Sequence, residues 1–256
     1  MPQAVLAAQL YTLREYTQTL SDFATSMRKV RQMGYTSVQV SGIGPINPTD
    51  VKAVLADNGL SVCITHIGYE RLLKDLPAVI AEHRLWNCVN VAVGSLPGSY
   101  RDAGEEGYQQ FAQEASHIGR LLSEAGLTFS YHNHSFEFVR FGKRTALDVI
   151  YGESDPRYLQ AEIDTYWVQH GGGDPALWIR KMKGRMPVAH LKDMVIINGQ
   201  QAMAEVGEGN LNWPEILSAC SDAGVRWYAV EQDICQRDPF ESLAISYNNV
   251  HAMGLN

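Results

Sequence analysis

The stretch AVLAAQLYTLREYT, residues 4–17, separates the two folds that a chain of alternating strands and helices can adopt. Its first half, AVLAAQL, is a continuous apolar run of the kind that forms a buried strand. An open, doubly wound sheet usually has a glycine-rich turn directly after its first strand. The segment that follows this run, YTLREYT, contains no glycine, so the stretch favours a closed barrel.

Seven further apolar runs alternate with stretches of helical period along the rest of the chain. We expect strands at residues 4–10, 37–42, 61–66, 88–94, 127–132, 159–164, 186–192 and 227–232. Helical stretches cover residues 20–34, 48–59, 75–86, 106–126, 213–224 and 238–254, with shorter ones at 145–150 and 175–184. Eight such alternations in a chain of about 250 residues predict a (β/α)8 TIM barrel. The 256 residues show no linker or shift in composition, so we expect a single domain over residues 1–256.

Composition and charge restrict the partners that the protein can have. The formal net charge of −7 argues against a surface that neutralises phosphates, so nucleic acid is a poor candidate partner. The four cysteines are scattered without a CxxC pair, which favours reduced thiols in a cytoplasmic protein. We see no signal peptide and no apolar run of the roughly 20 residues that a membrane span needs. These features predict a cytoplasmic protein that does not act at a membrane.

Polar and ionisable residues gather at the predicted strand ends. In a barrel, the carboxyl ends of the strands surround one pocket. Six of the eight ends carry candidates: Gln9, Tyr11, Thr65, His66, His132, Asn133, His134, Glu137, Glu162, Asp164, Trp167, His170, His190, Lys192, Asp193, Glu231, Gln232 and Asp233. Any one of them has a structural explanation, since a strand-end aspartate commonly caps the next helix. Carboxylates and imidazoles on four successive strand ends together predict a site for Mn²⁺, Mg²⁺, Co²⁺ or Zn²⁺.

Five motifs carry a resemblance to a known family. They are YHNHSFEF (131–138), AEIDTYWVQHGGGDP (161–175), GRMPVAHLKDM (184–194), EVGEGNLNW (205–213) and VEQD (230–233). In this order and spacing they resemble the sugar phosphate isomerase/epimerase family of xylose isomerase-like barrels. The wider superfamily also holds ketose 3-epimerases, inosose dehydratases and endonuclease IV. The resemblance covers nearly the whole chain, and its second half is the more specific.

The resemblance implies one divalent metal held by a Glu, an Asp, a His and a Glu on separate strands. Asp164, His190 and Glu231 match three of these ligands. Many relatives have a glutamate where His132 stands in this chain, so the first ligand is either Glu137, folded back, or His132 itself. A carboxylate better preserves the charge balance of the site, and we therefore favour the set Glu137, Asp164, His190 and Glu231.

The resemblance further implies an isomerase or epimerase that acts on a keto-sugar or related polyol through an enediolate. Its alternative is a metal-dependent lyase or dehydratase acting on a 3-keto-sugar, keto-glycoside or keto-inositol. An endonuclease IV-like phosphodiesterase, which the acidic charge disfavours, and a sugar-binding barrel without catalysis are further alternatives. A homo-oligomer is possible only by analogy with other barrels.

Roles for individual residues follow from the same resemblance. Glu137 and Glu231 would share the proton transfers, and His132 and His134 would assist. Lys192 has two interpretations, either stabilising the enediolate oxygen or pairing with Asp193 or Glu205. The remaining candidates would contact the sugar: Tyr11, His66, Trp167, His170 and Glu208. Two glycines without a neighbouring Lys or Arg make EVGEGN a weak phosphate site, and a tight turn with Glu208 over the pocket is the simpler interpretation.

Overall fold

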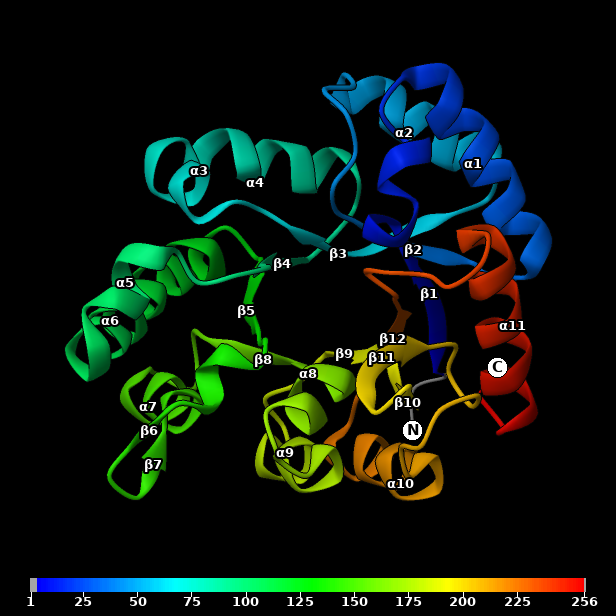
Figure 1. Ribbon diagram of the computed structural model, residues 1–256. Helices are drawn as coiled ribbons and strands as arrows, with labels where there is room; N and C mark the ends of the chain where they lie inside the picture. The colour runs from blue at the N-terminus through cyan, green and yellow to red at the C-terminus, as the bar shows by residue number, and fades with distance from the viewer. Residues whose placement is uncertain (1–3, 256) are drawn as a thin grey trace.

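Eight parallel strands form a closed barrel at the centre of the computed structural model, which describes residues 4–255 (Figure 1). Their order around the barrel is β1-β12-β9-β8-β5-β4-β3-β2, and β12 pairs with β1 to close it. The bounds are β1 Val5–Gln9, β2 Ser37–Val40, β3 Ser61–His66, β4 Asn90–Val93, β5 Thr128–His132, β8 Gln160–Asp164, β9 Val188–Leu191 and β12 Trp227–Val230. Each predicted strand contains one of these strands, which confirms the predicted (β/α)8 barrel.

The helices surround the strands on the outside (Figure 1). They are α1 Leu20–Met33, α2 Pro48–Asp57, α3 Tyr69–Lys74, α4 Leu76–Leu85, α5 Gly98–Asp102, α6 Gly104–Glu124, α7 Ala146–Glu153, α8 Thr165–His170, α9 Pro175–Lys181, α10 Trp213–Ala223 and α11 Pro239–Ala252. All eight predicted helical stretches are helices. The three short helices α3, α5 and α8 were not predicted, and α8 begins directly at the end of β8.

Local signals explain where the helices begin and end. The Thr19 side chain accepts a hydrogen bond from Asp22 N at 3.2 Å and caps the start of α1. Gly34 ends that helix in the left-handed conformation, at φ 114°, which glycine adopts without steric cost. Prolines in the first turn of α10 and α11 have no N–H that the helix would leave unpaired.

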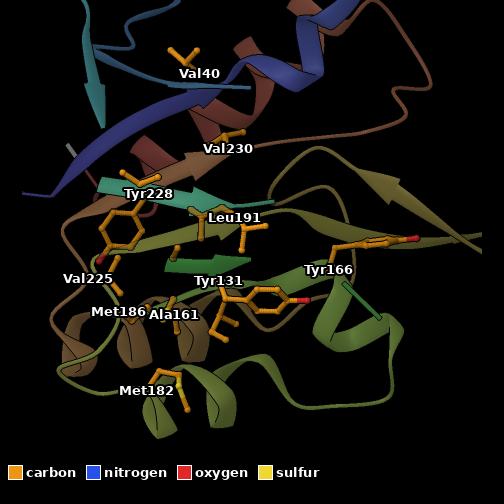
Figure 2. Packing of buried hydrophobic residues seen from close by; sticks show 14 of the residues in the cluster. Val40, Tyr131, Ala161, Tyr166, Met182, Met186, Leu191, Val225, Tyr228 and Val230 are labelled. Carbon is orange, nitrogen blue, oxygen red and sulfur yellow. The ribbon is translucent and has the colours of Figure 1, made fainter. Parts of the chain in front are cut away.

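Successive residues of a strand point to opposite sides of the barrel wall. The outward side chains of β5, β8, β9 and β12 pack in the core between the strands and the helices. Figure 2 shows Tyr131, Ala161, Leu191 and Val230 from these four neighbouring strands, together with Met182 and Met186. The residues next to them in sequence, which include His132, Glu162, His190 and Glu231, therefore face the interior.

Small side chains fill the barrel interior beneath these inward residues. Ala7, Ala92, Val188 and Ala229 belong to a buried cluster separate from the outer core. Each lies two residues before an inward-facing position at the carboxyl end, namely Gln9, Gly94, His190 and Glu231. Small apolar side chains therefore pack below these four positions, and most ionisable side chains lie toward the carboxyl ends of the strands.

Two hairpins and two 3-10 helices lie outside the regular pattern. One 3-10 helix, Leu10–Tyr16, follows β1, and the other, Phe136–Phe138, follows β5. The hairpins are β6–β7 (Arg140–Phe141 and Arg144–Thr145) and β10–β11 (Asp193–Ile197 and Gln200–Ala204). Within the described range the four cysteines are free thiols, as expected. No helix of that range combines the length and apolarity that crossing a membrane requires.

Candidate metal and substrate site

A pocket of about 330 Å³ opens at the carboxyl ends of the strands. Its lining residues follow β1, β2, β3, β4, β5 and β12: Tyr11, Ser41, His66, Ile67, Gly68, Gly94, Ser95, His132, His134, Glu231 and Asp233. Gly94 leaves room for the His66 ring, because a Cβ at this position would lie 2.7 Å from His66 Nδ1. A larger pocket of about 430 Å³ lies at the opposite end of the barrel, among the starts of β5, β8 and β9. The smaller pocket is the one lined by predicted strand-end residues: Tyr11, His66, His132, His134, Glu231 and Asp233.

Four buried side chains from four neighbouring strands converge at one side of this pocket. We call them the strand-end cluster: His132 of β5, Asp164 of β8, His190 of β9 and Glu231, which follows β12. One nitrogen or oxygen atom of each lies within 4.8 Å of the corresponding atom of every other. Two imidazoles and two carboxylates at this spacing are a suitable donor set for a divalent cation.

The two imidazoles are held so that one nitrogen of each faces the carboxylates. His190 Nε2 donates to Gln39 Oε1 at 2.7 Å, which turns Nδ1 toward Glu231 Oε2 at 3.3 Å and Asp164 Oδ2 at 3.6 Å. His132 Nδ1 donates to the Gly94 carbonyl at 3.0 Å, which places Nε2 3.3 Å from Asp164 Oδ2. Metal-binding histidines are oriented in this way by a partner on the far ring nitrogen.

Positive charge is favoured at the centre of the cluster. Burial alone lowers the pKa of His190, but Glu162, Asp164 and Glu231 outweigh it and raise that pKa well above 6.5. Neither His190 Nδ1 nor Glu231 Oε2 has a hydrogen-bond partner among residues 4–255. A proton on Nδ1 or a metal ion would satisfy both atoms, so the residues present fit a divalent cation.

Asp164 both caps the following helix and contributes an oxygen to the cluster. Its Oδ1 accepts a hydrogen bond from Trp167 N at 2.8 Å and caps α8. Its Oδ2 faces His132 and His190 in the cluster. Burial would raise the pKa of Asp164, but Lys192 and the two imidazoles lower it well below 3.8. The cap therefore fixes the carboxylate in the orientation that presents its second oxygen to the cluster.

Glu162 supports the cluster from below. This fully buried carboxylate lies 2.8 Å from His66 Nε2 through Oε2 and 3.1 Å from His190 Nε2 through Oε1. Burial would raise the pKa of Glu162, but His190 and His66 outweigh it and lower that pKa. Burial also lowers the pKa of His66, whose Nδ1 faces Gln9 Nε2 at 3.5 Å. His66, predicted to contact substrate, thus lines the pocket with both ring nitrogens already engaged.

The Lys192 side chain, which follows the last residue of β9, also extends to the carboxylates of the cluster. Its Nζ lies 2.6 Å from Glu231 Oε2, 3.1 Å from Asp164 Oδ2 and 2.8 Å from Asp233 Oδ2. Burial would lower the pKa of Lys192, but these three carboxylates raise it well above 10.5. The carboxylate partners suggested from the sequence, Asp193 and Glu205, are therefore not the partners that the structure shows.

Glu137 does not join the cluster, contrary to the favoured prediction. Its fully buried carboxylate accepts a hydrogen bond from the Tyr131 hydroxyl at 2.5 Å and another from His134 N at 2.9 Å. Tyr131 points away from the barrel interior, and Glu137 turns with it. The Glu137 carboxylate therefore lies outside the cluster, and His132 stands in it instead.

Glu208 also lies elsewhere than predicted. Its side chain is exposed, and its Oε1 accepts a hydrogen bond from Asn249 Nδ2 at 3.1 Å, beside α11. The loop that carries it folds around the Asp193 carboxylate, which receives hydrogen bonds from Gly207 N at 2.9 Å and Gly209 N at 3.1 Å. A Cβ at Gly209 would come within 2.3 Å of Asp193 Oδ1. The glycines of EVGEGN therefore admit a carboxylate, and Glu208 does not cover the pocket.

The remaining predicted residues surround the pocket at different depths. Tyr11 lines it directly and is 37% exposed. His134 also lines it, and burial together with His132 and Lys192 lowers the pKa of His134 to about 3. The Trp167 ring lies 5.3 Å from the His134 ring and 5.5 Å from Lys192 Nζ. His170 packs behind Trp167, with ring centroids 5.4 Å apart, and is not among the residues lining the pocket.

Several residues of the site had no role in the sequence prediction. Glu162 and Asp233 were recognised as strand-end carboxylates without a function, although Glu162 shares a strand face with Asp164 two residues later. Gln39, Ser41 and Ser95 come from β2 and β4 or the residues after them, whose ends carry no carboxylate or imidazole. In the strand SVQV, a glutamine between two valines was a usable signal for Gln39.

Comparisons with known proteins place the fold and the family. A crystal structure of a sugar phosphate isomerase/epimerase from Parabacteroides distasonis is 23% identical, with a TM-score of 0.81 over 100% of this chain and 96% of that chain. The structure of L-ribulose 3-epimerase is 17% identical, with a TM-score of 0.71 over 99% of this chain and 95% of that chain. These likenesses show the fold.

The relatives found by sequence carry the name of a different enzyme, a dehydratase. An inosose dehydratase from Bacillus anthracis is 26% identical over 157 residues, which cover 54% of this chain and 51% of the relative. The chain thus spans about half the length of the curated relatives that it matches. A family model described as xylose isomerase-like TIM barrel matches residues 27–239, most of the chain. The protein therefore belongs to the xylose isomerase-like TIM barrel family.

Proposed function

We propose that this protein is a divalent-metal-dependent isomerase or epimerase that acts on a keto-sugar or related polyol through an enediolate. One observation carries the proposal. His132 and His190 are each held by a hydrogen bond on the far ring nitrogen, so that their other nitrogens face the cluster carboxylates, and His132 and Glu231 of this cluster also line a sugar-sized pocket. Such a set holds a cation and leaves one side open to a small molecule.

The strand-end cluster would hold the metal, which is Mn²⁺, Mg²⁺, Co²⁺ or Zn²⁺. A bound divalent cation supplies Lewis-acid polarisation of a carbonyl, which acidifies the neighbouring C–H bond. The two carboxylates of the cluster balance its charge, while Lys192 and Asp233 balance each other. His132 takes the place that we had favoured for Glu137, so the proposed set is His132, Asp164, His190 and Glu231.

Two groups on different sides of the pocket suit the proton transfers. Burial lowers the pKa of His134 to about 3, so its ring is neutral at neutral pH but is a weak base, which takes a proton only from a strongly acidified C–H bond. Asp233 lines the pocket after β12, and its hydrogen bond with the Lys192 ammonium gives the pair a proton to return to the substrate. Strands β5 and β12 are separated by β8 and β9 around the barrel. Removal of a proton from one side and its return from another is what isomerisation or epimerisation requires.

The pocket favours an uncharged sugar over a sugar phosphate. Tyr11 offers an aromatic face, and Ser41 and Ser95 offer hydroxyl groups. Among the described residues, no arginine or lysine lines the pocket, and the buried Lys192 ammonium is already surrounded by three carboxylates. The expected partner is thus a small neutral keto-sugar, and the net charge of −7 disfavours nucleic acid.

Elimination is the second candidate function, and the inosose dehydratase relatives favour it. Both reactions begin by removing a proton next to a ketone. If the adjacent carbon carries a leaving group, the enediolate expels it, and Asp233 would protonate that group instead of the carbon. The substrate would then be a 3-keto-sugar, keto-glycoside or keto-inositol.

Proton exchange with solvent tests the proposal. The protein with Mn²⁺ is incubated with unphosphorylated 2-keto and 3-keto sugars in D₂O and followed by NMR. We expect deuterium at the carbon next to the ketone, with an isomeric product for isomerisation and an unsaturated product for elimination. Deuterium incorporation by none of these sugars would contradict both functions.

The ligand assignment has its own measurement. We expect His190→Ala and Asp164→Ala to weaken Mn²⁺ binding by at least about 100-fold, because each removes a donor and leaves the facing group unpaired. Glu208→Ala serves as the control, since this exposed side chain lies outside the pocket. Unchanged Mn²⁺ affinity in both cluster variants would overturn the proposed metal site.

A further inference from the structure

The Lys192 ammonium contacts three carboxylates with two different geometries. It donates a hydrogen bond to Asp233 Oδ2 at 2.8 Å. Its 2.6 Å contact with Glu231 Oε2 is closer, yet that oxygen has no hydrogen-bond partner among residues 4–255. The ammonium is therefore directed at Asp233, while it lies against Glu231 and Asp164 mainly as a positive charge.

The oxygens that Lys192 approaches are those of the strand-end cluster. Asp164 Oδ2 faces His132 Nε2, and both Asp164 Oδ2 and Glu231 Oε2 face His190 Nδ1. Lys192 Nζ lies 3.1 Å and 2.6 Å from these same two oxygen atoms. A divalent cation held by the cluster would therefore share both oxygens with an ammonium, and two like charges that close repel each other.

Asp233 offers the ammonium a partner outside the cluster. It lines the pocket, its side chain is 23% exposed, and it is not one of the four cluster residues. A hydrogen bond to Asp233 can hold Lys192 when its contacts with Asp164 and Glu231 are lost. Lys192 is fully buried, so its charge would otherwise have no partner.

We propose that Lys192 and Asp233 together set the affinity of the strand-end cluster for its metal. Lys192 competes with the cation for Asp164 Oδ2 and Glu231 Oε2, and Asp233 retains the ammonium when the cation binds. The pair makes the metal more weakly held than the four donors alone would make it. This inference rests on the proposed metal site and adds two residues that act on affinity without being ligands.

A double-mutant cycle in Mn²⁺ affinity tests the inference. Free and bound Mn²⁺ are measured by electron paramagnetic resonance for the wild type, Lys192→Met, Asp233→Asn and the double variant. We expect Lys192→Met to bind at least about tenfold more tightly and Asp233→Asn at least about tenfold more weakly. Because Asp233 acts through Lys192, the double variant should bind like Lys192→Met, within about threefold. Lys74→Met, which removes an exposed lysine paired with Glu70, is the matched control and should bind like the wild type.

Each outcome of the cycle supports or overturns the inference. Equal or weaker binding by Lys192→Met overturns the competition between Lys192 and the metal. A double variant that returns to wild-type affinity shows two independent charge effects and overturns the role of Asp233. If Lys192→Met does not fold without Mn²⁺, Lys192→Gln replaces it, with the affinity taken from competition with a chelator.

The cycle also separates this inference from the proposed function. Mn²⁺ binding that His190→Ala abolishes, combined with an unchanged affinity in Lys192→Met, keeps the metal site and overturns only the competition. Absence of Mn²⁺ binding by the wild type, Lys192→Met and Lys192→Gln alike overturns both.

Discussion

The buried carboxylate of Asp193 and the two carboxylates of the strand-end cluster lie at the same end of the barrel. Their charges are satisfied in opposite ways. Asp193 receives five hydrogen bonds, from Met194 N, Gly207 N, Gly209 N, Leu211 N and Trp213 Nε1. In the strand-end cluster, Asp164 Oδ2 and Glu231 Oε2 instead face imidazole nitrogens and an ammonium. A carboxylate with N–H donors on both oxygens organises a loop, whereas carboxylate oxygens without N–H donors from the backbone favour a cation.

Asp193→Ala tests whether the Asp193 carboxylate organises the loop, and it should have the largest effect on stability. The substitution leaves five N–H groups without their acceptor, four of them on backbone that the loop needs in order to fold. We expect the free energy of unfolding to fall by about 3–5 kcal/mol, measured by urea denaturation. Mn²⁺ affinity of the folded variant should stay within about threefold of the wild type, because Asp193 faces away from the cluster. A stable variant that has lost its metal would reverse the two assignments.

Glu137 is an intermediate case, since its buried carboxylate has only two donors. Burial raises its pKa from 4.5 to about 7, although Tyr131 and His134 N partly oppose this. Between these two values the unfolded chain has lost the proton that the folded protein keeps, so stability falls as pH rises from about 4.5 to about 7. The fall attributable to this group is about 3 kcal/mol and is complete above the folded-state pKa.

Glu137→Gln should remove this pH dependence, because glutamine keeps the shape and does not titrate. Thermal or urea unfolding at pH 5 and pH 7.5 provides the measurement. We expect the wild type to lose more stability than the variant over this interval, by up to about 3 kcal/mol. Parallel losses in the two proteins would mean that Glu137 ionises normally and that its two donors suffice.

The sequence predicted the barrel because strand and helix periods repeat eight times and the C-terminal strand ends must meet. The same argument predicted that Asp164, His190 and Glu231 would converge, and the structure brings them together. Strand bounds were less accurate: the run at residues 186–192 becomes β9 at Val188–Leu191, in part because Pro187 lacks a donor N–H. The β10–β11 hairpin was missed, although Asn198-Gly199, with φ values of 50° and 77°, is a typical hairpin turn.

Side-chain orientation was the part that the sequence could not predict. Glu137 lies five residues after His132, and either could have reached the cluster. The choice depends on the Tyr131 hydroxyl, which holds Glu137 on the outer side of the strand. The His190–Gln39 hydrogen bond joins residues 151 positions apart, so no local pattern reveals it. Contacts of this kind depend on the closed barrel and not on any one segment.

Gln39→Leu should have the smallest effect of these substitutions, a modest loss of Mn²⁺ affinity. Loss of the Gln39 oxygen frees His190 Nε2 from its 2.7 Å hydrogen bond, but Glu162 Oε1 remains 3.1 Å away and retains part of the orientation. We therefore expect Mn²⁺ affinity to fall by about tenfold, the lower end for a partner of a metal-binding histidine. Gln160→Leu, at the other end of β8, makes the same substitution away from the cluster and should leave affinity unchanged. If both variants bind Mn²⁺ like the wild type, Glu162 alone orients His190, and the imidazole is held more by a carboxylate than by the amide.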